Sequence, residues 1–249
     1  MNRKLRQISV LAVLLVAAVA ASAASAGKLP ANLPTLNDSQ LSPQFGALGG
    51  AAPLATDRTI PHWFGSFTDG SNGVTYGYNM VGVDPATNGS STIPVDIIPL
   101  NISFDAFGGY AMNGTDVVSA TVGSPLFTSN DYSSTTASSG GPGVLSHGNV
   151  GQLEDVTMRS QFNKVGTGYH LQLGTPTVWL PQLFHVPASQ GTLSLSGRSV
   201  VLGLVSADWF SSRIQNLINS LHLDPTHLPI FLTNNTMLYR GNDPFAPGA

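Results

Sequence analysis

The sequence predicts a mixed α+β fold, a single strand-rich domain with two main helices. Three observations lead to this fold class. Several segments alternate apolar and polar residues with a period of two, which is typical of half-buried strands. Two other segments have the wider apolar spacing of amphipathic helices. The resulting order is strands, helix, strands, helix and strand, with no internal repeat.

The first 26 residues have the pattern of a secretory signal peptide. Three basic residues stand at the start: Arg3, Lys4 and Arg6. An uncharged apolar run from Ile8 to about Ala20 follows, and Ala24-Ser25-Ala26 has small residues where a signal peptidase requires them. The run is shorter than the roughly 20 apolar residues of a spanning helix. We therefore expect cleavage after Ala26, a secreted or periplasmic protein, and no stable membrane anchor after cleavage.

Residues 27–57 form a Pro-, Gly- and Ala-rich leader segment in which we expect little regular structure. The globular α+β domain is predicted to span residues 58–249. Its first strand is predicted over 74–80, and the next over 93–104. Pro94 and Pro99 lack the N–H groups of a sheet ladder, so the second strand is expected at a sheet edge or broken by a bulge.

A short strand is predicted over 117–122, and a long exposed loop over the Ser-, Thr- and Gly-rich stretch 128–148. The shorter helix is predicted over 150–163. The remaining expected strands are 169–173, 177–186, 192–195, 199–205 and 229–233, with a hairpin turn at 196–198. The clearest helix is 207–221, which begins after a fit N-cap, Ser206, and stops before Asp224-Pro225.

Composition excludes several classes of function. Charged residues make up only 9% of the chain, against roughly 25% in ordinary domains. The chain has 10 Lys and Arg and 13 Asp and Glu; three basic residues leave with the signal peptide, which leaves seven basic and 13 acidic residues, a net charge of −6. This balance argues against nucleic acid as a partner. The absence of cysteine excludes disulfides, thiolate catalysis and Cys-ligated zinc.

The common catalytic motifs are missing. There is no G-x-S-x-G and no P-loop, and Glu154, the only glutamate, is not part of an H-E-x-x-H motif. Glu154 and Asp155 are helical neighbours and therefore point in different directions. His170 is interpreted as a buried, hydrogen-bonded histidine, and His222 and His227 as parts of a polar loop. We assign no catalytic residue, no cofactor site and no metal ligand, and we expect no cofactor.

Seven short segments between about residues 59 and 239 carry a family resemblance. They are 59–68 (TIPHWFGSFT), 73–76 (GVTY), 80–85 (MVGVDP), 93–100 (IPVDIIPL), 124–127 (SPLF), 169–174 (YHLQLG) and 228–233 (LPIFLT). Together they resemble the opening of an uncharacterised family of exported bacterial proteins. Longer members carry a downstream cysteine pair and a zinc-peptidase-like His-Glu…Glu-Trp segment, both absent here. The resemblance thus implies the N-terminal part of a longer architecture and assigns no catalytic residue.

Two classes of function remain. The first is an exported, non-catalytic extracytoplasmic protein: a surface, matrix or ligand-binding module, or the N-terminal portion of a longer protein. The alternative is a secreted, peptidase-like hydrolase whose His and Asp site the sequence does not identify. The missing motifs favour the non-catalytic protein, and no ligand is assigned.

Overall fold

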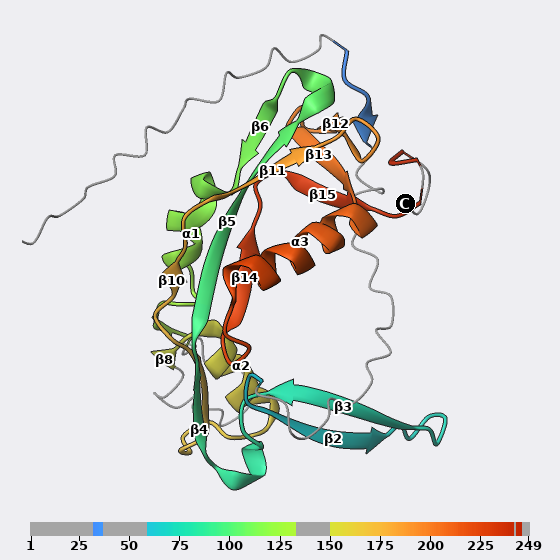
Figure 1. Ribbon diagram of the computed structural model, residues 1–249. Helices are drawn as coiled ribbons and strands as arrows, with labels where there is room; N and C mark the ends of the chain where they lie inside the picture. The colour runs from blue at the N-terminus through green and yellow to red at the C-terminus, as the bar shows by residue number, and fades with distance from the viewer. Residues whose placement is uncertain (1–31, 37–58, 133–149, 242, 246–249) are drawn as a thin grey trace, which may run out of the picture.

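A computed structural model describes residues 32–36, 59–132, 150–241 and 243–245. Figure 1 shows one long strand, β5 (Val95–Phe104), running along the length of the molecule. At its upper end lies a sheet with helix α3 (Ala207–Leu221) beside it. At its lower end a hairpin of β2 (His62–Thr68) and β3 (Thr75–Val81) projects away from the body. The mixed, strand-rich α+β domain that the sequence predicts is therefore what the chain forms.

Strand β5 is the centre of the larger sheet. It pairs in parallel with β14 (Leu228–Leu232) on one side and with β10 (Thr177–Val178) and β11 (Gln182–Val186) on the other, and β6 (Tyr110–Asn113) joins antiparallel to its end. Residues Val95 to Leu100 are all buried, because the first half of the strand is covered on both faces. From Leu100 to Phe104 apolar and polar residues alternate, as predicted.

A four-stranded sheet lies at the upper end. Its order is β1 (Thr35–Leu36), β12 (Gly191–Ser196), β13 (Val201–Ser206) and β15 (Thr236–Tyr239). The predicted hairpin at residues 196–198 joins β12 and β13 in antiparallel register. Three two-stranded ribbons complete the sheets: β2 with β3; β4 (Ser90–Ile93) with β9 (His170–Leu173); and β7 (Asn130–Asp131) with β8 (Val150–Gly151).

Two apolar clusters hold these layers together. The larger contains Ile98, Leu100, Ile102 and Phe104 of β5, and the apolar stripe of α3 packs against it. The stripe is in the predicted place, but Phe210, Ile214 and Leu217 are only half-buried, because α3 covers the cluster from one side. Arg213 lies over the rings of Trp209 and Phe184, with its guanidinium carbon 5.9 and 5.7 Å from the two centroids.

The smaller cluster organises the lower end. Its buried members are Ile93, Met158, Tyr169 and Leu171, contributed by β4, by α2 (Leu153–Gln161), and by β9 and the residue before it. Met80 of the hairpin packs on this cluster. Helix α2 ends where Asn163 adopts a left-handed φ of 53°, three residues before the glycine that the sequence suggested as its end.

Two expectations about individual elements are wrong. Residues 117–122 are not a strand: a 3₁₀ turn over Gly114–Val117 leads into the short helix α1 (Val118–Val122). Strand β5 is central rather than at an edge. Ser206 does stand at the N-cap of α3, but its side chain makes no capping hydrogen bond.

The prolines of β5 are accommodated by interruptions in the neighbouring backbone. Pro94 falls between β4 and β5. Opposite Pro99 the parallel ladder has a gap, because β10 ends at Val178 beside Ile97 and β11 resumes at Gln182 beside Leu100. On that side, no paired residue of a described strand therefore requires a hydrogen bond from the N–H that Pro99 lacks.

The predicted signal peptide and most of the predicted loop 128–148 lie outside the described residues. The same is true of the predicted leader 27–57, except for residues 32–36, which include strand β1. Within the described ranges, no helix combines the length and the apolar character needed to cross a membrane.

Candidate functional site

The hairpin of β2 and β3 has two different faces. Cross-strand pairs put Trp63, Met80, Tyr78 and Phe67 on one face, since residues paired across a ladder share a side. On this face the Trp63 ring meets Tyr78 edge-on at 5.5 Å and Phe162, next to α2, at 5.7 Å. The hairpin is thus anchored to the body at its base by aromatic contacts.

Helix α2 is held against β9 by side chains of its first turn. The Gln152 amide bonds both backbone groups of Leu173, accepting from its N–H at 2.6 Å and donating to its carbonyl at 2.7 Å. Asp155 accepts the N–H of Leu171 at 3.0 Å. These side chains occupy the edge of β9 that β4 does not cover, much as another strand would.

Asp155 is fully buried, and its carboxylate interacts with several donor groups. His170 donates its Nδ1–H to the carboxylate, with 3.0 Å to Oδ2 and 3.2 Å to Oδ1, and Arg159 lies 3.6 Å away, one turn along the helix. About a third of the His170 side chain remains exposed. His170 is therefore hydrogen-bonded as expected, but it is half-buried rather than buried, with its Nε2 free of the Asp155 contact.

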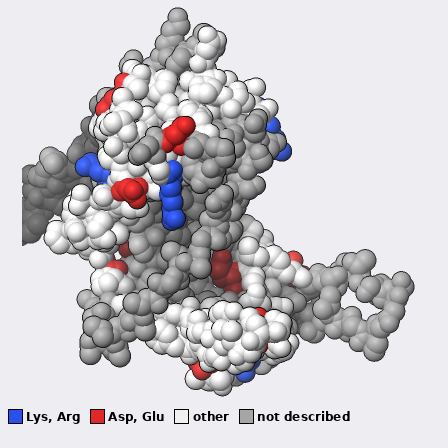
Figure 2. Space-filling view, turned by 90° about the vertical axis from the view of Figure 1, so that its right-hand side faces the viewer, with Lys and Arg blue, Asp and Glu red and all other residues white. Residues whose placement is uncertain are grey.

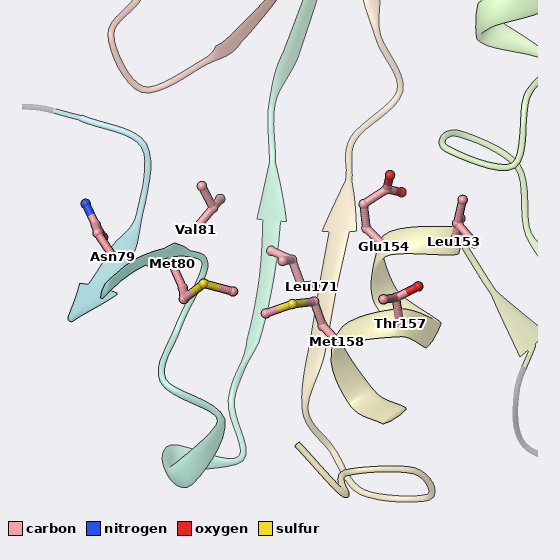
Figure 3. A pocket seen from close by; sticks show the side chains of 8 residues that line it. All are labelled: Asn79, Met80, Val81, Leu153, Glu154, Thr157, Met158 and Leu171. Atoms are coloured by element: carbon pink, nitrogen blue, oxygen red, sulfur yellow. The ribbon is translucent and has the colours of Figure 1, made fainter. Parts of the chain in front are cut away.

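Between the hairpin and α2 lies an open pocket with a volume of about 510 Å³. Figure 3 shows its walls: Met80 and Val81 on the hairpin side, Leu153 and Met158 on α2, and Leu171 on β9. Polar groups come only from Asn79, Thr157 and Glu154. A concave, largely apolar surface with a few polar groups is the usual form of a ligand site.

Glu154 is the unusual group in this pocket. Its Oε2 is fully covered and has no hydrogen-bond partner among the described residues, although a buried carboxyl oxygen ordinarily has one. Burial raises the pKa of the Glu154 carboxyl, and a bond to its own backbone N–H opposes the shift only in part. Glu154 and its neighbour Asp155 point in different directions, as the sequence indicated, and occupy opposite environments.

None of the other histidines that the structure describes lines this pocket. His227 contacts the buried Asp96 of β5 at 2.9 Å, and His185 contacts Ser103 at 2.9 Å across β11 and β5. The His222 ring contacts the carbonyl of Ser220 at 3.1 Å, two residues before it in the chain. In the portion of the chain that the structure describes, no three His, Asp or Glu side chains gather as metal ligands.

Comparison with known proteins adds no family: no protein-family model, no curated protein and no solved structure matches this chain.

Sequence reasoning missed the pocket. Asn79, Met80 and Val81 were recognisable only as the end of a strand, and Glu154 only as a polar residue of a helix. The one available signal was the single glutamate of the chain, placed next to Leu153 at the start of a helix.

Proposed function

We propose that this chain is an exported, non-catalytic extracytoplasmic binding module, and that the pocket between β3 and α2 is its ligand site. The observation that carries the proposal is the concave, largely apolar pocket that includes one carboxyl group, that of the half-buried Glu154, whose pKa is raised by burial. A protonated Glu154 offers one hydrogen-bond donor to a ligand whose remaining contacts are with Met80, Met158 and Leu171. The ligand class that fits is an uncharged apolar group with a hydrogen-bond acceptor at one side.

Export rests on the N-terminal pattern of charge, apolar run and small residues. When the chain is expressed in a bacterial host, we expect the protein recovered from the medium or periplasm to begin at Gly27, within a few residues. Intact-mass measurement checks this result. Full-length cytoplasmic protein that starts at Met1, with none exported, would contradict it.

The pocket is tested with the uncharged fluorescent probe N-phenyl-1-naphthylamine. We expect saturable binding to the mature protein, tighter at low pH and several-fold weaker as the pH rises through the raised pKa of Glu154, because an apolar ligand displaces the water that supports the ionised carboxylate. Fluorescence titration between pH 4 and about pH 8 measures the affinity, a window that brackets the ordinary glutamate value. Glu154→Gln should remove the pH dependence.

A matched pair of α2 variants supplies the control. Thr157 and Ser160 are both exposed on α2, but only Thr157 lines the pocket. Thr157→Trp fills the pocket and should abolish probe binding, whereas Ser160→Trp adds the same ring elsewhere on the helix. Equal binding by wild type and Thr157→Trp would show that the probe binds at another place.

One observation supports the alternative function, a secreted hydrolase. The buried Asp155 orients His170 in the way that a carboxylate orients a catalytic imidazole. A nucleophile bonded to the other ring nitrogen would complete such a site, and no hydroxyl within the described ranges makes that bond to His170. We therefore place the hydrolase second, and a His170-dependent release of nitrophenol from p-nitrophenyl butyrate would reverse this order.

A further inference from the structure

Among the described strands, β3 pairs only with β2, so its other edge, next to the pocket, has no strand partner in the described ranges. The register of the β2–β3 ladder and the hydrogen bonds at its two ends decide which backbone groups point outward. Asp69 donates to the Val74 carbonyl at 2.9 Å and Gly82 to the Pro61 carbonyl at 2.7 Å, so these two pairs are hydrogen-bonded pairs. Such pairs alternate along an antiparallel ladder. The backbone groups of Asn79 and Val81 consequently point away from β2.

These outward groups have no partner within the described part of the chain. No hydrogen bond to another element involves the N–H or C=O of Asn79 or Val81, and both residues are exposed. The contrast with β9 is direct, since side chains of Gln152 and Asp155 fill the equivalent edge there. An open edge of this kind is a template for another strand.

The pocket lies along this same edge. Consecutive residues of a strand point to opposite faces, so a cavity over one face touches every second residue. Here the cavity contacts three residues in a row, Asn79, Met80 and Val81. It must therefore run beside the strand, between the outward backbone groups of β3 and the first turns of α2 (Figure 3).

We propose that β3 binds an extended polypeptide segment by strand addition, with one apolar side chain of that segment seated against Met158 and Leu171. This inference rests on the proposed function, since it uses the same pocket and names its ligand. Main-chain groups that alternate along a strand edge are complemented by the main chain of another strand. The hairpin contributes one carboxylate, Asp69, and no Lys or Arg. Figure 2 shows charged side chains of both signs in separate small groups on the face that it views, without one large patch of a single sign. The segment that fits is therefore uncharged.

The geometry favours a single segment over a second copy of this chain. In a symmetric dimer joined through β3, the partner's own hairpin would place its other strand about 4.8 Å farther out from the shared ladder. That position lies on the side of the pocket where α2 stands. A second strand behind the added segment would therefore extend toward the helix, which favours a single segment.

The experiment uses an acetylated and amidated heptapeptide, Ser-Thr-Thr-Leu-Thr-Thr-Ser, titrated into the mature protein by calorimetry. Two further peptides are N-methylated at alternate residues, one at the odd positions and one at the even positions. Only one of these sets of N–H groups can face β3. We expect one methylated peptide to bind about tenfold or more weakly, since each lost hydrogen bond costs about 1 kcal/mol, and the other to bind like the parent.

A pair of protein variants tests the same contact from the other side. Asn79→Ala and Asn79→Pro both remove the side chain, but only proline removes the outward N–H, and an outward N–H on an edge strand is where proline is tolerated. Binding of the parent peptide should be several-fold weaker to Asn79→Pro than to Asn79→Ala. Amide exchange at Val81 should slow when the peptide is added.

The outcomes separate the two proposals. Absence of naphthylamine binding to the wild-type protein would overturn the proposed function itself. Intact probe binding with equal affinity for both methylated peptides, or with no peptide binding, would overturn strand addition alone. Concentration-dependent dimers that the peptide does not dissociate would likewise overturn it in favour of a second copy on this edge.

Discussion

Asp155→Ala is expected to lower the free energy of unfolding by about 3–5 kcal/mol, the range for removing one partner of a buried ionic group. The carboxylate is fully buried and accepts from His170 and from the N–H of Leu171, with Arg159 beside it. Without it, the N–H of Leu171 has no acceptor and the guanidinium of Arg159 loses a neighbouring negative charge. Urea denaturation of the mature protein, followed by circular dichroism, measures the difference.

The neighbouring acid is the control for this prediction. Glu154→Gln changes a carboxyl on the same helical turn, but one that burial holds in an unfavourable environment when ionised. A raised native pKa favours folding at low pH, and that advantage is lost as the pH rises through the raised value. At neutral pH Glu154→Gln should therefore leave stability unchanged or slightly higher. A loss below about 1 kcal/mol for Asp155→Ala would show that Asp155 is not a structural centre of the lower cluster.

Gly114→Ala is expected to destabilise the fold by about 3 kcal/mol, at the upper end of the range for overpacked interiors. A Cβ at this position would overlap the Leu232 carbonyl oxygen and lie 2.7 Å from both the N and the O of Leu100. All three are backbone atoms of paired strands, β14 and β5, so neither side can move without breaking a ladder. Thermal and urea unfolding should both report the loss.

Gly70→Ala is the control substitution for Gly114→Ala. A Cβ on Gly70 meets no atom within 4 Å, and the residue sits in the exposed turn of the hairpin. Its substitution should change stability by less than about 0.5 kcal/mol, as is usual for surface positions. An equally mild effect of Gly114→Ala would show that the 3₁₀ turn does not pack tightly against β5 and β14.

The elements that sequence predicted well are those whose signals are local. Helix α3 is found at its predicted bounds because the apolar spacing of Phe210, Ile214 and Leu217 is read within one segment, and Asp224-Pro225 stops it. Strand β5 is a harder case, because its prolines indicate an edge. Pro99 is tolerated in a central strand because β10 and β11 leave a gap opposite it. That gap lies in another segment of the chain, so the sequence of β5 alone does not predict it.

The candidate site could not be predicted from the sequence for the same reason, because it depends on contacts between separate segments. In the described ranges, the pocket lies where β3 has one edge without a partner strand, while the edge of β9 is filled by Gln152 and Asp155. The pairing of Asp155 with His170 joins a helix to a strand and depends on how the two pack. Local patterns indicated that Glu154 and Asp155 diverge, but not that one would be enclosed with donors and the other left in an apolar pocket.

The central position of β5 also has a consequence for the order in which the chain can fold. Ile97 pairs with Val178 and with Ile230, so the strand is completed only by segments synthesised long after it. Its second half can pair early with β6, but its first half pairs only with β10 and β14 among the described strands. Contacts of such long sequence separation form slowly. The first half of β5 is therefore expected to find its sheet partners late in synthesis. Export of the chain in an extended state, as the proposed function requires, is compatible with that delay.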